Sequence, residues 1–270
     1  MKAWEVINRP VFIVSDLHAG DGGPRDSFRF GNRLKQFFSF LQFVKGENGR
    51  LVIAGDLFDF WQSNLSKVIV NNLDLISFFS SLHATYILGN HDSDLNYFAG
   101  TELVAISLIQ NAVKSLDLSM GGKKFTIIHG HQADPYCVSD TPGVGRVTAI
   151  ISGIAEDRHG GPMASKYKTI AQKVVGPMDR AVSHFRWLTG RPSREVGMNL
   201  ELLKIREQAG ADVLISGHTH KAGQIKSLYY NTGCWCEFRN SFVRIEANGF
   251  VSCWDWRDGR PVGFGGVLPV

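Results

Sequence analysis

The sequence lacks any long apolar run, although 44% of its 270 residues are hydrophobic. Its apolar stretches are short and interrupted by charges, so none is long enough to cross a bilayer as a helix. Residues 1–10, MKAWEVINRP, contain neither the apolar stretch nor the cleavage pattern of a secretory signal peptide. We therefore expect a soluble cytoplasmic protein without a transmembrane segment. A chain of this length buries roughly 70–75% of its unfolded surface, which is enough for one large domain.

Cysteine and net charge are also scarce. The four cysteines lack the paired spacing of a zinc finger, and a chain of this size does not need disulfides. We expect them to be buried or free thiols. The net charge is only +4, so the composition favours no stable nucleic-acid partner. The glycines between Asp16 and Asp26 lack the Lys and Ser or Thr of a phosphate-binding loop, which leaves them a conformational role.

Short apolar runs and helical patterns alternate through the first half of the chain. Buried strands are predicted at residues 11–15, 51–54 and 84–88, and helices at 32–45 and 65–82. This order predicts a largely parallel sheet with right-handed crossovers. The patterns that follow predict a helix near 100–112, a hairpin of 113–119 and 123–128, and a strand at 211–216. We interpret the short strands of 222–257 as a second, mainly antiparallel sheet.

Residues 132–210 differ in character from the rest of the chain. Prolines and glycines near 135–162 precede helical patterns at 163–189 and 193–208. We expect a helical cap here, inserted into a core formed by residues 1–131 and 211–270. Between Thr141 and Gly210 there are eleven Lys or Arg against six Asp or Glu, so the insertion is the basic part of the chain. A solvated helical face and an anion-binding surface over an active site both explain this charge.

Five polar motifs follow predicted strands and contain six of the nine histidines. They are DLH at 16–18, GDLFD at 55–59, GNHD at 89–92, HGH at 129–131 and GHTH at 217–220. The carboxyl ends of parallel strands meet at one edge of a sheet, where open α/β folds bind ligands. Carboxylate, imidazole and amide ligands suit Mn, Fe, Zn, Co or Ni. At least seven good ligands exceed the requirement of one ion, so we expect two divalent transition metal ions, with Mn favoured.

The ordered set of five motifs resembles the calcineurin-like metallophosphoesterases, over residues 11–220. The resemblance implies an α/β fold, a four-layer αββα sandwich of two mixed sheets flanked by helices. It also implies a dinuclear site in which one metal is bound by Asp16, His18 and His220, the other by Asn90, His129 and His218, with Asp56 as the bridge. A water bridging the two metals would become hydroxide and attack phosphorus in line.

His91 is the candidate for catalysis rather than ligation. Imidazole is the side chain that most readily exchanges a proton near neutral pH, so a histidine here can donate a proton to the leaving oxygen. The resemblance makes Asp59 the residue that orients it, and the alternative is that Asp59 and Asp92 only tie loops through backbone hydrogen bonds. His131 lies two residues after His129, so on an extended strand end both side chains would point to one face. His131 could therefore either support the metal ligands or contact the substrate, and the sequence does not choose between these two roles.

The substrate is indicated less closely than the reaction. GDLFDFW, the helical insertion and YYNTGCW at 229–235 resemble the UDP-2,3-diacylglucosamine hydrolases of lipid A synthesis, which split a pyrophosphate in a lipid-bearing nucleotide sugar. This chain departs from them, because His91 stands where they usually have Arg and HGHQAD replaces a simpler HGD. The expected partner is a small-molecule phosphoester, in one version lipid-bearing, with candidate contacts at His131, Arg146 and Lys166.

Several alternatives stay open at this point. The aromatic residues Tyr167, Phe185 and Trp187 of the insertion are interpreted as packing, and the basic insertion is also compatible with contact to a membrane surface. A nuclease or nucleotide phosphodiesterase would use the same metals. A non-catalytic scaffold would keep the fold and the metals and bind partners instead. The sequence does not determine the oligomeric state.

Overall fold

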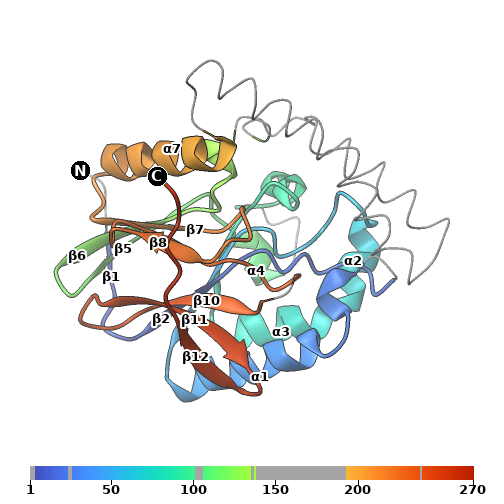
Figure 1. Ribbon diagram of the computed structural model, residues 1–270. Coiled ribbons are helices and arrows are strands. Elements are labelled where there is room, and N and C mark those ends of the chain that lie inside the picture. Colours follow the sequence, from blue (N-terminus) through green and yellow to red (C-terminus); the bar gives the residue numbers. More distant parts are fainter. Residues whose placement is uncertain (1–3, 24–25, 101–105, 135–136, 138–192, 238) are drawn as a thin grey trace.

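The computed structural model describes residues 4–23, 26–100, 106–134, 137, 193–237 and 239–270. In these parts of the chain two six-stranded sheets lie face to face, with helices on their outer faces (Figure 1). The predicted α/β sandwich of two mixed sheets flanked by helices is confirmed. Most of the predicted insertion, including Arg146, Lys166 and its three aromatic residues, lies outside the described residues. The domain boundaries at 132 and 210 therefore stay predictions.

The first sheet contains the N-terminal parallel strands β2 (Val11–Val14), β3 (Arg50–Ala54) and β4 (Thr85–Ile87). Helix α1 (Arg33–Gly46) connects β2 to β3, and α2 (Leu65–Asn71) and α3 (Leu73–Ser81) connect β3 to β4. The helix predicted at 65–82 is thus two helices. The break comes at Asn72, whose buried amide donates to the carbonyl oxygens of both Val68 and Gly20, each at 2.8 Å.

The second sheet has the strand order β1, β5, β6, β7, β9, β8. Its strands are β1 (Glu5–Val6), β5 (Leu116–Met120), β6 (Lys123–Ile127), β7 (Val213–Ser216), β8 (Gly223–Ile225) and β9 (Tyr229–Asn231). The predicted hairpin is confirmed, since β5 and β6 pair antiparallel. Ser193 caps the N-terminus of helix α7 (Arg194–Ala209), since its hydroxyl accepts a hydrogen bond from the amide of Val196.

Short helical turns complete the described structure. They are η1 (Ser27–Arg29), η2 (Ser93–Tyr97), α4 (Ser107–Gln110) and η3 (His131–Ala133). Of the helix predicted near 100–112, the described residues contain only the single turn of α4. Among the described residues, no helix has the length and apolarity that crossing a membrane requires.

The prediction that residues 222–257 form a sheet of their own is wrong. Strands β8 and β9 belong to the second sheet, where β9 pairs parallel to β7. Strands β10 (Ser241–Ile245), β11 (Val251–Arg257) and β12 (Arg260–Phe264) extend the first sheet, where β10 pairs antiparallel to β2. The chain crosses from one sheet to the other between Asn231 and Ser241. Trp235 anchors this crossing, fully buried with its ring 4.7 Å from that of Phe37.

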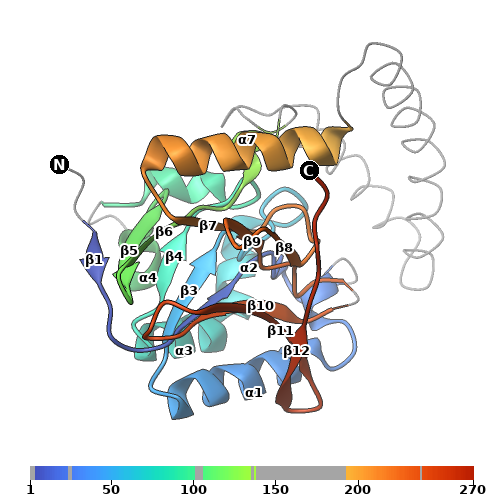
Figure 2. The same cartoon turned by 60° about the vertical axis from the view of Figure 1, so that its left-hand side comes forward.

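Three apolar layers hold the sandwich together. Alternation along β2 turns Phe12 toward the helices and Ile13 toward the second sheet, where it packs in one cluster with Phe125 and Val213. Helix α7 covers the outer face of the second sheet through Leu202, which is fully buried. Figure 2 shows α7 along the top of the sandwich and α1 along the bottom. The parallel strands of both sheets are thereby fixed with their carboxyl ends toward one side of the molecule.

Candidate metal centre

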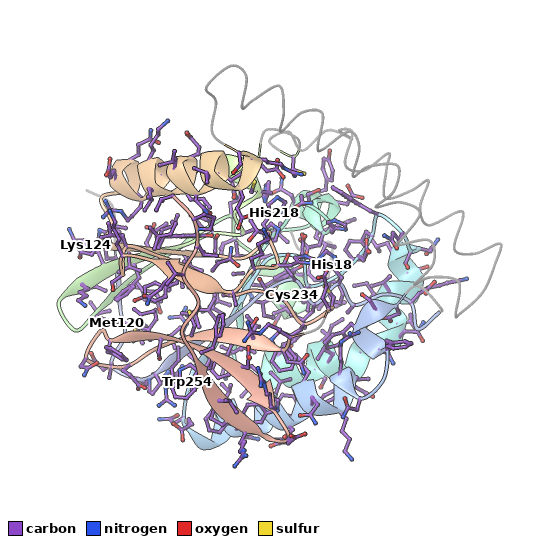
Figure 3. The ribbon with its side chains drawn as sticks, in the orientation of Figure 1. His18, Met120, Lys124, His218, Cys234 and Trp254 are labelled. Carbon is purple, nitrogen blue, oxygen red and sulfur yellow. The ribbon has the colours of Figure 1, made fainter. Side chains whose placement is uncertain are left out.

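The five polar motifs meet at this one side of the sandwich. Three follow β2, β3 and β4 of the first sheet, and two follow β6 and β7 of the second. Figure 3 shows His18 and His218 close together there, whereas Met120 and Lys124 lie at the opposite end. The expected convergence thus spans two facing sheets, not the edge of a single sheet. All seven predicted metal ligands and His91 contribute to the cluster. The two predicted substrate contacts Arg146 and Lys166 lie outside the described residues.

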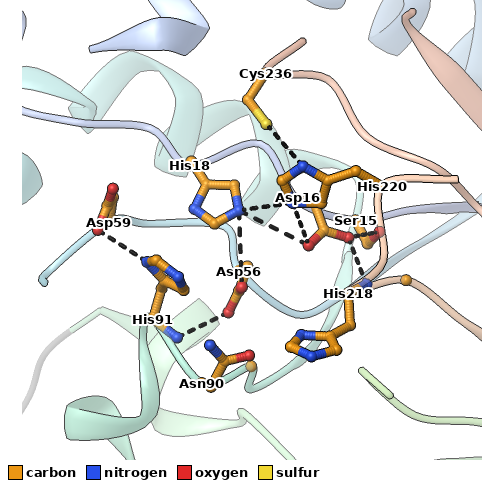
Figure 4. Close-up of polar contacts among 12 residues, drawn as sticks. Ser15, Asp16, His18, Asp56, Asp59, Asn90, His91, His218, His220 and Cys236 are labelled. Atoms are coloured by element: carbon orange, nitrogen blue, oxygen red, sulfur yellow. Dashed lines mark hydrogen bonds and ion pairs between the residues drawn. The ribbon is translucent and has the colours of Figure 1, made fainter. Parts of the chain in front are cut away.

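One group of side chains surrounds Asp16. The Nε2 atom of His220 lies 3.2 Å from Oδ1 of Asp16, and Nε2 of His18 lies 3.8 Å from the same oxygen. The two Nε2 atoms are 3.3 Å apart. Three potential ligand atoms therefore face one small volume, as Figure 4 shows.

A second group surrounds His129, whose ring is fully buried. Its Nε2 lies 3.1 Å from Oδ1 of Asn90 and 3.2 Å from Oδ2 of Asp56. Ligand atoms of Asp56, His129 and His218 all lie within 4.8 Å of one another. Oδ2 of Asp56 is also 3.7 Å from Nε2 of His18, in the first group. Asp56 thus stands between the two groups, in the place that a bridging ligand would need, and the ligand assignment itself stays a prediction.

His91 borders the two groups and is partly exposed. Its Nδ1 lies 3.0 Å from Oδ1 of Asp59, and its ring stacks on Trp61 at a centroid distance of 3.9 Å. Asp59 also accepts a hydrogen bond from the amide of Trp61, so it both contacts His91 and ties its own loop. Asp92 is fully buried and accepts from the amides of Leu57 and Gly89 and from the Tyr86 hydroxyl, as expected for a residue that ties loops.

The position of His131 differs from the extended strand end that we expected. Gly130 has a φ of 114°, which turns the chain, and His131 begins the helical turn η3. Its ring centroid lies 5.4 Å from that of His129. Burial and the neighbouring His129 lower the pKa of His131 to about 3, so its imidazole is neutral at physiological pH. Whether it contacts substrate stays a prediction.

Sequence reasoning missed three side chains at the centre. Trp61 and Asp134 are the last residues of the segments GDLFDFW and HGHQAD, but no role was predicted for either, and Glu237 lies outside every motif. Oδ2 of Asp134 is 3.0 Å from Nε2 of His218, and Oε1 of Glu237 is 3.3 Å from Nδ1 of His220. The cysteines are free, as expected, with Cys234, Cys236 and Cys253 buried, and Cys236 lies beside His220.

Burial and mutual charge set the protonation of the cluster. Burial alone would raise the pKa values of Asp16 and Asp56, but the charges of nearby histidines, led by His220 and His129 respectively, hold both well below their usual range. Burial would lower the pKa of His129, but Asp56 and Asp16 raise it to about 9. Burial is likewise outweighed at His220, where Cys236 and Asp16 raise the pKa well above its usual value. Without metal, protonated imidazoles neutralise the buried carboxylates.

The backbone of the ligand residues is strained. Ten described residues other than glycine have positive φ, and five of them are predicted ligands: Asp16, His18, Asp56, His218 and His220, with φ between 50° and 71°. This left-handed region costs an ordinary residue roughly 1–2 kcal/mol. Hydrogen bonds between the motifs hold it in place, including that from the His218 amide to Oδ2 of Asp16 at 2.9 Å. Strain concentrated on a few clustered side chains is typical of a functional site.

Two glycines allow the motifs to approach so closely. A Cβ atom at Gly89 would overlap the carboxylate of Asp56, and one at Gly217 would overlap the side chains of Ser15 and Asp16. No hydrogen bond of good geometry reaches the buried Oδ1 of Asp16, whose neighbours are the imidazoles of His220 and His18, so a nearby positive charge, from a protonated imidazole or a bound cation, must offset its burial. Mixed carboxylate, imidazole and amide ligands converging in two groups fit two divalent transition metal ions.

Several known proteins are similar to this chain. Residues 9–222 match the family model of the calcineurin-like phosphoesterases. A UDP-2,3-diacylglucosamine hydrolase of Psychromonas ingrahamii is 24% identical over 249 residues, covering 87% of this chain and 93% of the relative. Among solved structures, a mutant of Vps29 from Entamoeba histolytica shares 16% identity at a TM-score of 0.45, covering 95% of this chain and 99% of its own. A dimetal phosphatase from Danio rerio shares 10% identity at a TM-score of 0.46, covering 93% and 99%.

The match to the family model begins before the first of the five motifs and ends after the last. It therefore includes every residue that we place in the two groups around Asp56. This chain belongs to the calcineurin-like phosphoesterase family and is a phosphoester hydrolase.

Proposed function

We propose that this chain hydrolyses a phosphodiester or pyrophosphate bond of a small-molecule substrate with the help of two divalent transition metal ions, with manganese favoured. The observation that carries the proposal is the pair of convergent ligand groups that share Asp56 (Figure 4). Asp16, His18 and His220 would hold one ion, Asn90, His129 and His218 the other, and Asp56 both. Two bound ions would supply an activated hydroxide at neutral pH and stabilise charge on the phosphoryl oxygens.

The side chains around the metals would divide the remaining work. Because Nδ1 of His91 contacts the Asp59 carboxylate, the proton on Nδ1 is held there and Nε2 is the atom left to exchange a proton with the leaving oxygen. Stacking on Trp61 keeps the plane of the His91 ring fixed. Asp56 also accepts the amide hydrogen of His91 at 2.9 Å, which ties the acid to the proposed bridge.

For the substrate we propose a nucleotide sugar that carries acyl chains, similar to UDP-2,3-diacylglucosamine. The support is the similarity to the Psychromonas ingrahamii hydrolase over 93% of that protein, together with the GDLFDFW and YYNTGCW segments. The basic residues of the insertion, Arg146 and Lys166 among them, would contact the diphosphate, and a location in the cytoplasm would give access to such a substrate. Two features set this chain apart from those hydrolases: His91 at the position where Arg is usual, and HGHQAD in place of HGD.

Metal binding at pH 7 should release about two protons per protein molecule, because a metal must displace the protons of His129 and His220. The pKa of His129 is raised to about 9, so this ring is protonated at pH 7 without metal, and the pKa of His220 is raised well above its usual value by Cys236 and Asp16. The affinity for Mn²⁺ should therefore rise with pH between 6 and 9. Calorimetry in buffers of different ionisation enthalpy measures the proton release, and binding that releases no protons would contradict this account.

Replacing His91 with alanine should leave both metals bound but lower kcat on a small chromogenic diester by about 10²–10⁴-fold, because the general acid is lost. Asp59→Asn should give a smaller loss, since the ring keeps a hydrogen-bond partner. Elemental analysis and kcat are measured together. His83→Asn is the matched control, because His83 is an exposed histidine outside the motifs. Unchanged turnover of His91→Ala would eliminate the acid role.

Replacing residues 138–192 with a short linker should spare hydrolysis of a small diester and abolish hydrolysis of UDP-2,3-diacylglucosamine. A short linker is feasible because Oδ2 of Asp134 and a guanidinium nitrogen of Arg194 are 2.6 Å apart, which places the two ends of the segment side by side. Rates on both substrates are compared, with metal content as the control for folding. Equal loss on both would assign the segment a folding role, and a full-length chain inactive on the nucleotide sugar would refute the proposed substrate.

A further inference from the structure

The two histidines of the GHTH motif each contact a carboxylate from outside the five motifs, but through different ring nitrogens. Asp134 lies 3.0 Å from Nε2 of His218, and Glu237 lies 3.3 Å from Nδ1 of His220. An ionised carboxylate only accepts hydrogen bonds, so the facing ring nitrogen donates and carries the proton. In a neutral imidazole the other nitrogen then presents its lone pair. That nitrogen is Nδ1 in His218 and Nε2 in His220.

We propose that Asp134 and Glu237 are positioning residues that determine which ring nitrogen of His218 and of His220 is available to a metal. The inference rests on the proposed function, because it takes both histidines as metal ligands. A carboxylate bonded to the far nitrogen of a metal-bound histidine fixes its tautomer and raises its basicity, and losing such a partner typically costs 10–100-fold in metal affinity.

The need for two orientations follows from the chain geometry. His218 and His220 are only two residues apart, and both have a left-handed backbone, with φ of 71° and 59°. Yet His218 groups with Asp56 and His129, whereas Nε2 of His220 faces Oδ1 of Asp16. Neighbouring residues with similar backbone conformation thus serve groups on either side of Asp56. Two metals can be reached in this way if His218 binds through Nδ1 and His220 binds through Nε2. Each ring then needs its own carboxylate, because a rotation of the ring by 180° would exchange its two nitrogens.

Asp134 is the stronger of the two positioning residues. It is fully buried, and its Oδ2 accepts both from Nε2 of His218 and from a guanidinium nitrogen of Arg194 at 2.6 Å. Arg194 begins helix α7, so the carboxylate is fixed between a helix and the ring that it orients. A charge-assisted hydrogen bond in a buried position is strong and directional.

Glu237 holds His220 less tightly. Its side chain is 36% exposed and the contact is longer, at 3.3 Å. The Sγ atom of Cys236 lies 3.8 Å from the same nitrogen and packs beside it (Figure 4). Removal of Glu237 should therefore cost less metal affinity than removal of Asp134, and it should affect the other metal.

The test is the titration of the full chain with Mn²⁺ alone. Asp134→Ala should weaken the binding of one of the two ions by about 10–100-fold. Asp134→Asn should recover part of that loss, because its amide oxygen still accepts a hydrogen bond. Glu237→Ala should weaken the binding of the other ion by less than about tenfold. Arg194→Met separates loss of the ion pair from loss of the contact with His218. Wild-type affinity in both alanine variants would overturn the proposal, as would an Arg194→Met loss equal to that of Asp134→Ala.

Asp212→Ala is the matched control for removal of a carboxylate. Asp212 is exposed, accepts a hydrogen bond from the amide of Lys124, and lies just before β7, at the end of that strand opposite His218. This variant should bind both ions as the wild type does. Equal weakening in Asp212→Ala and Asp134→Ala would reduce the effect to a loss of negative charge and would overturn the positioning role.

A second readout does not depend on metal affinity. Long-range ¹H–¹⁵N correlation spectra of the Zn²⁺-loaded chain should show the proton of His218 on Nε2 and that of His220 on Nδ1, and the reverse assignment would overturn the inference. Failure of the proposed function can be distinguished from failure of this inference. A chain that binds fewer than two ions, yet whose metal-free His218 keeps its proton on Nε2, would refute the two-metal proposal and leave the orientation by Asp134 supported.

Discussion

The rest of the structure depends on the burial of two carboxylates, Asp16 and Asp56, in one cluster with four histidines. A buried carboxylate is stable only if neighbouring charges and hydrogen bonds replace its lost hydration. Here the imidazoles of His129, His18 and His220 do so, with contacts of 3.2–3.8 Å to the carboxylate oxygens. These side chains come from the ends of β2, β3, β6 and β7, two strands of each sheet, so the cluster forms only when both sheets are in place.

The fold holds this arrangement through its backbone. Five of the predicted ligands have left-handed φ values, and hydrogen bonds between motifs keep them there. The glycines beside them let the backbone of one motif reach the side chains of another. Because the three apolar layers fix the strands, the strain at their ends is held by the packing of the whole sandwich.

Much of the centre was predictable because its residues follow buried strands. An apolar run that ends in Asp or His is visible in the sequence, and the order of such runs along the chain indicates that their ends converge. Which sheet each late strand joins was not predictable. The mostly apolar residues of β9 and β10 indicate buried strands, but they do not identify the partner strand, and the crossing at Trp235 carries no periodic signal.

The roles of single residues outside the five motifs could not be predicted from the sequence either. No pattern in the sequence indicates a role for Asp134 or Glu237, because their contacts with His218 and His220 depend on chain segments that meet only in the folded protein. The turn at Gly130 moved His131 away from the extended strand end that its spacing indicated. The break at Asn72 depends on a hydrogen bond to Gly20, 52 residues away along the chain.

His91 shows how one position alters the chemistry available at such a centre. An arginine stabilises negative charge but is effectively always protonated, so it cannot deliver a proton to a leaving group. An imidazole held by Asp59 and stacked on Trp61 can do both. In the proposed mechanism the reaction depends on residues at the strand ends, whereas the proposed substrate would also be selected by groups beyond them.

The central claim is that Asp56 bridges two metal ions, and anomalous X-ray scattering at the manganese edge, from crystals grown with Mn²⁺, tests it most directly. The account predicts two peaks about 3.5–4 Å apart, one on either side of the Asp56 carboxylate. One peak should lie against Asp16, His18 and His220, and the other against Asn90, His129 and His218. A single peak, or two peaks that do not share Asp56, would contradict it.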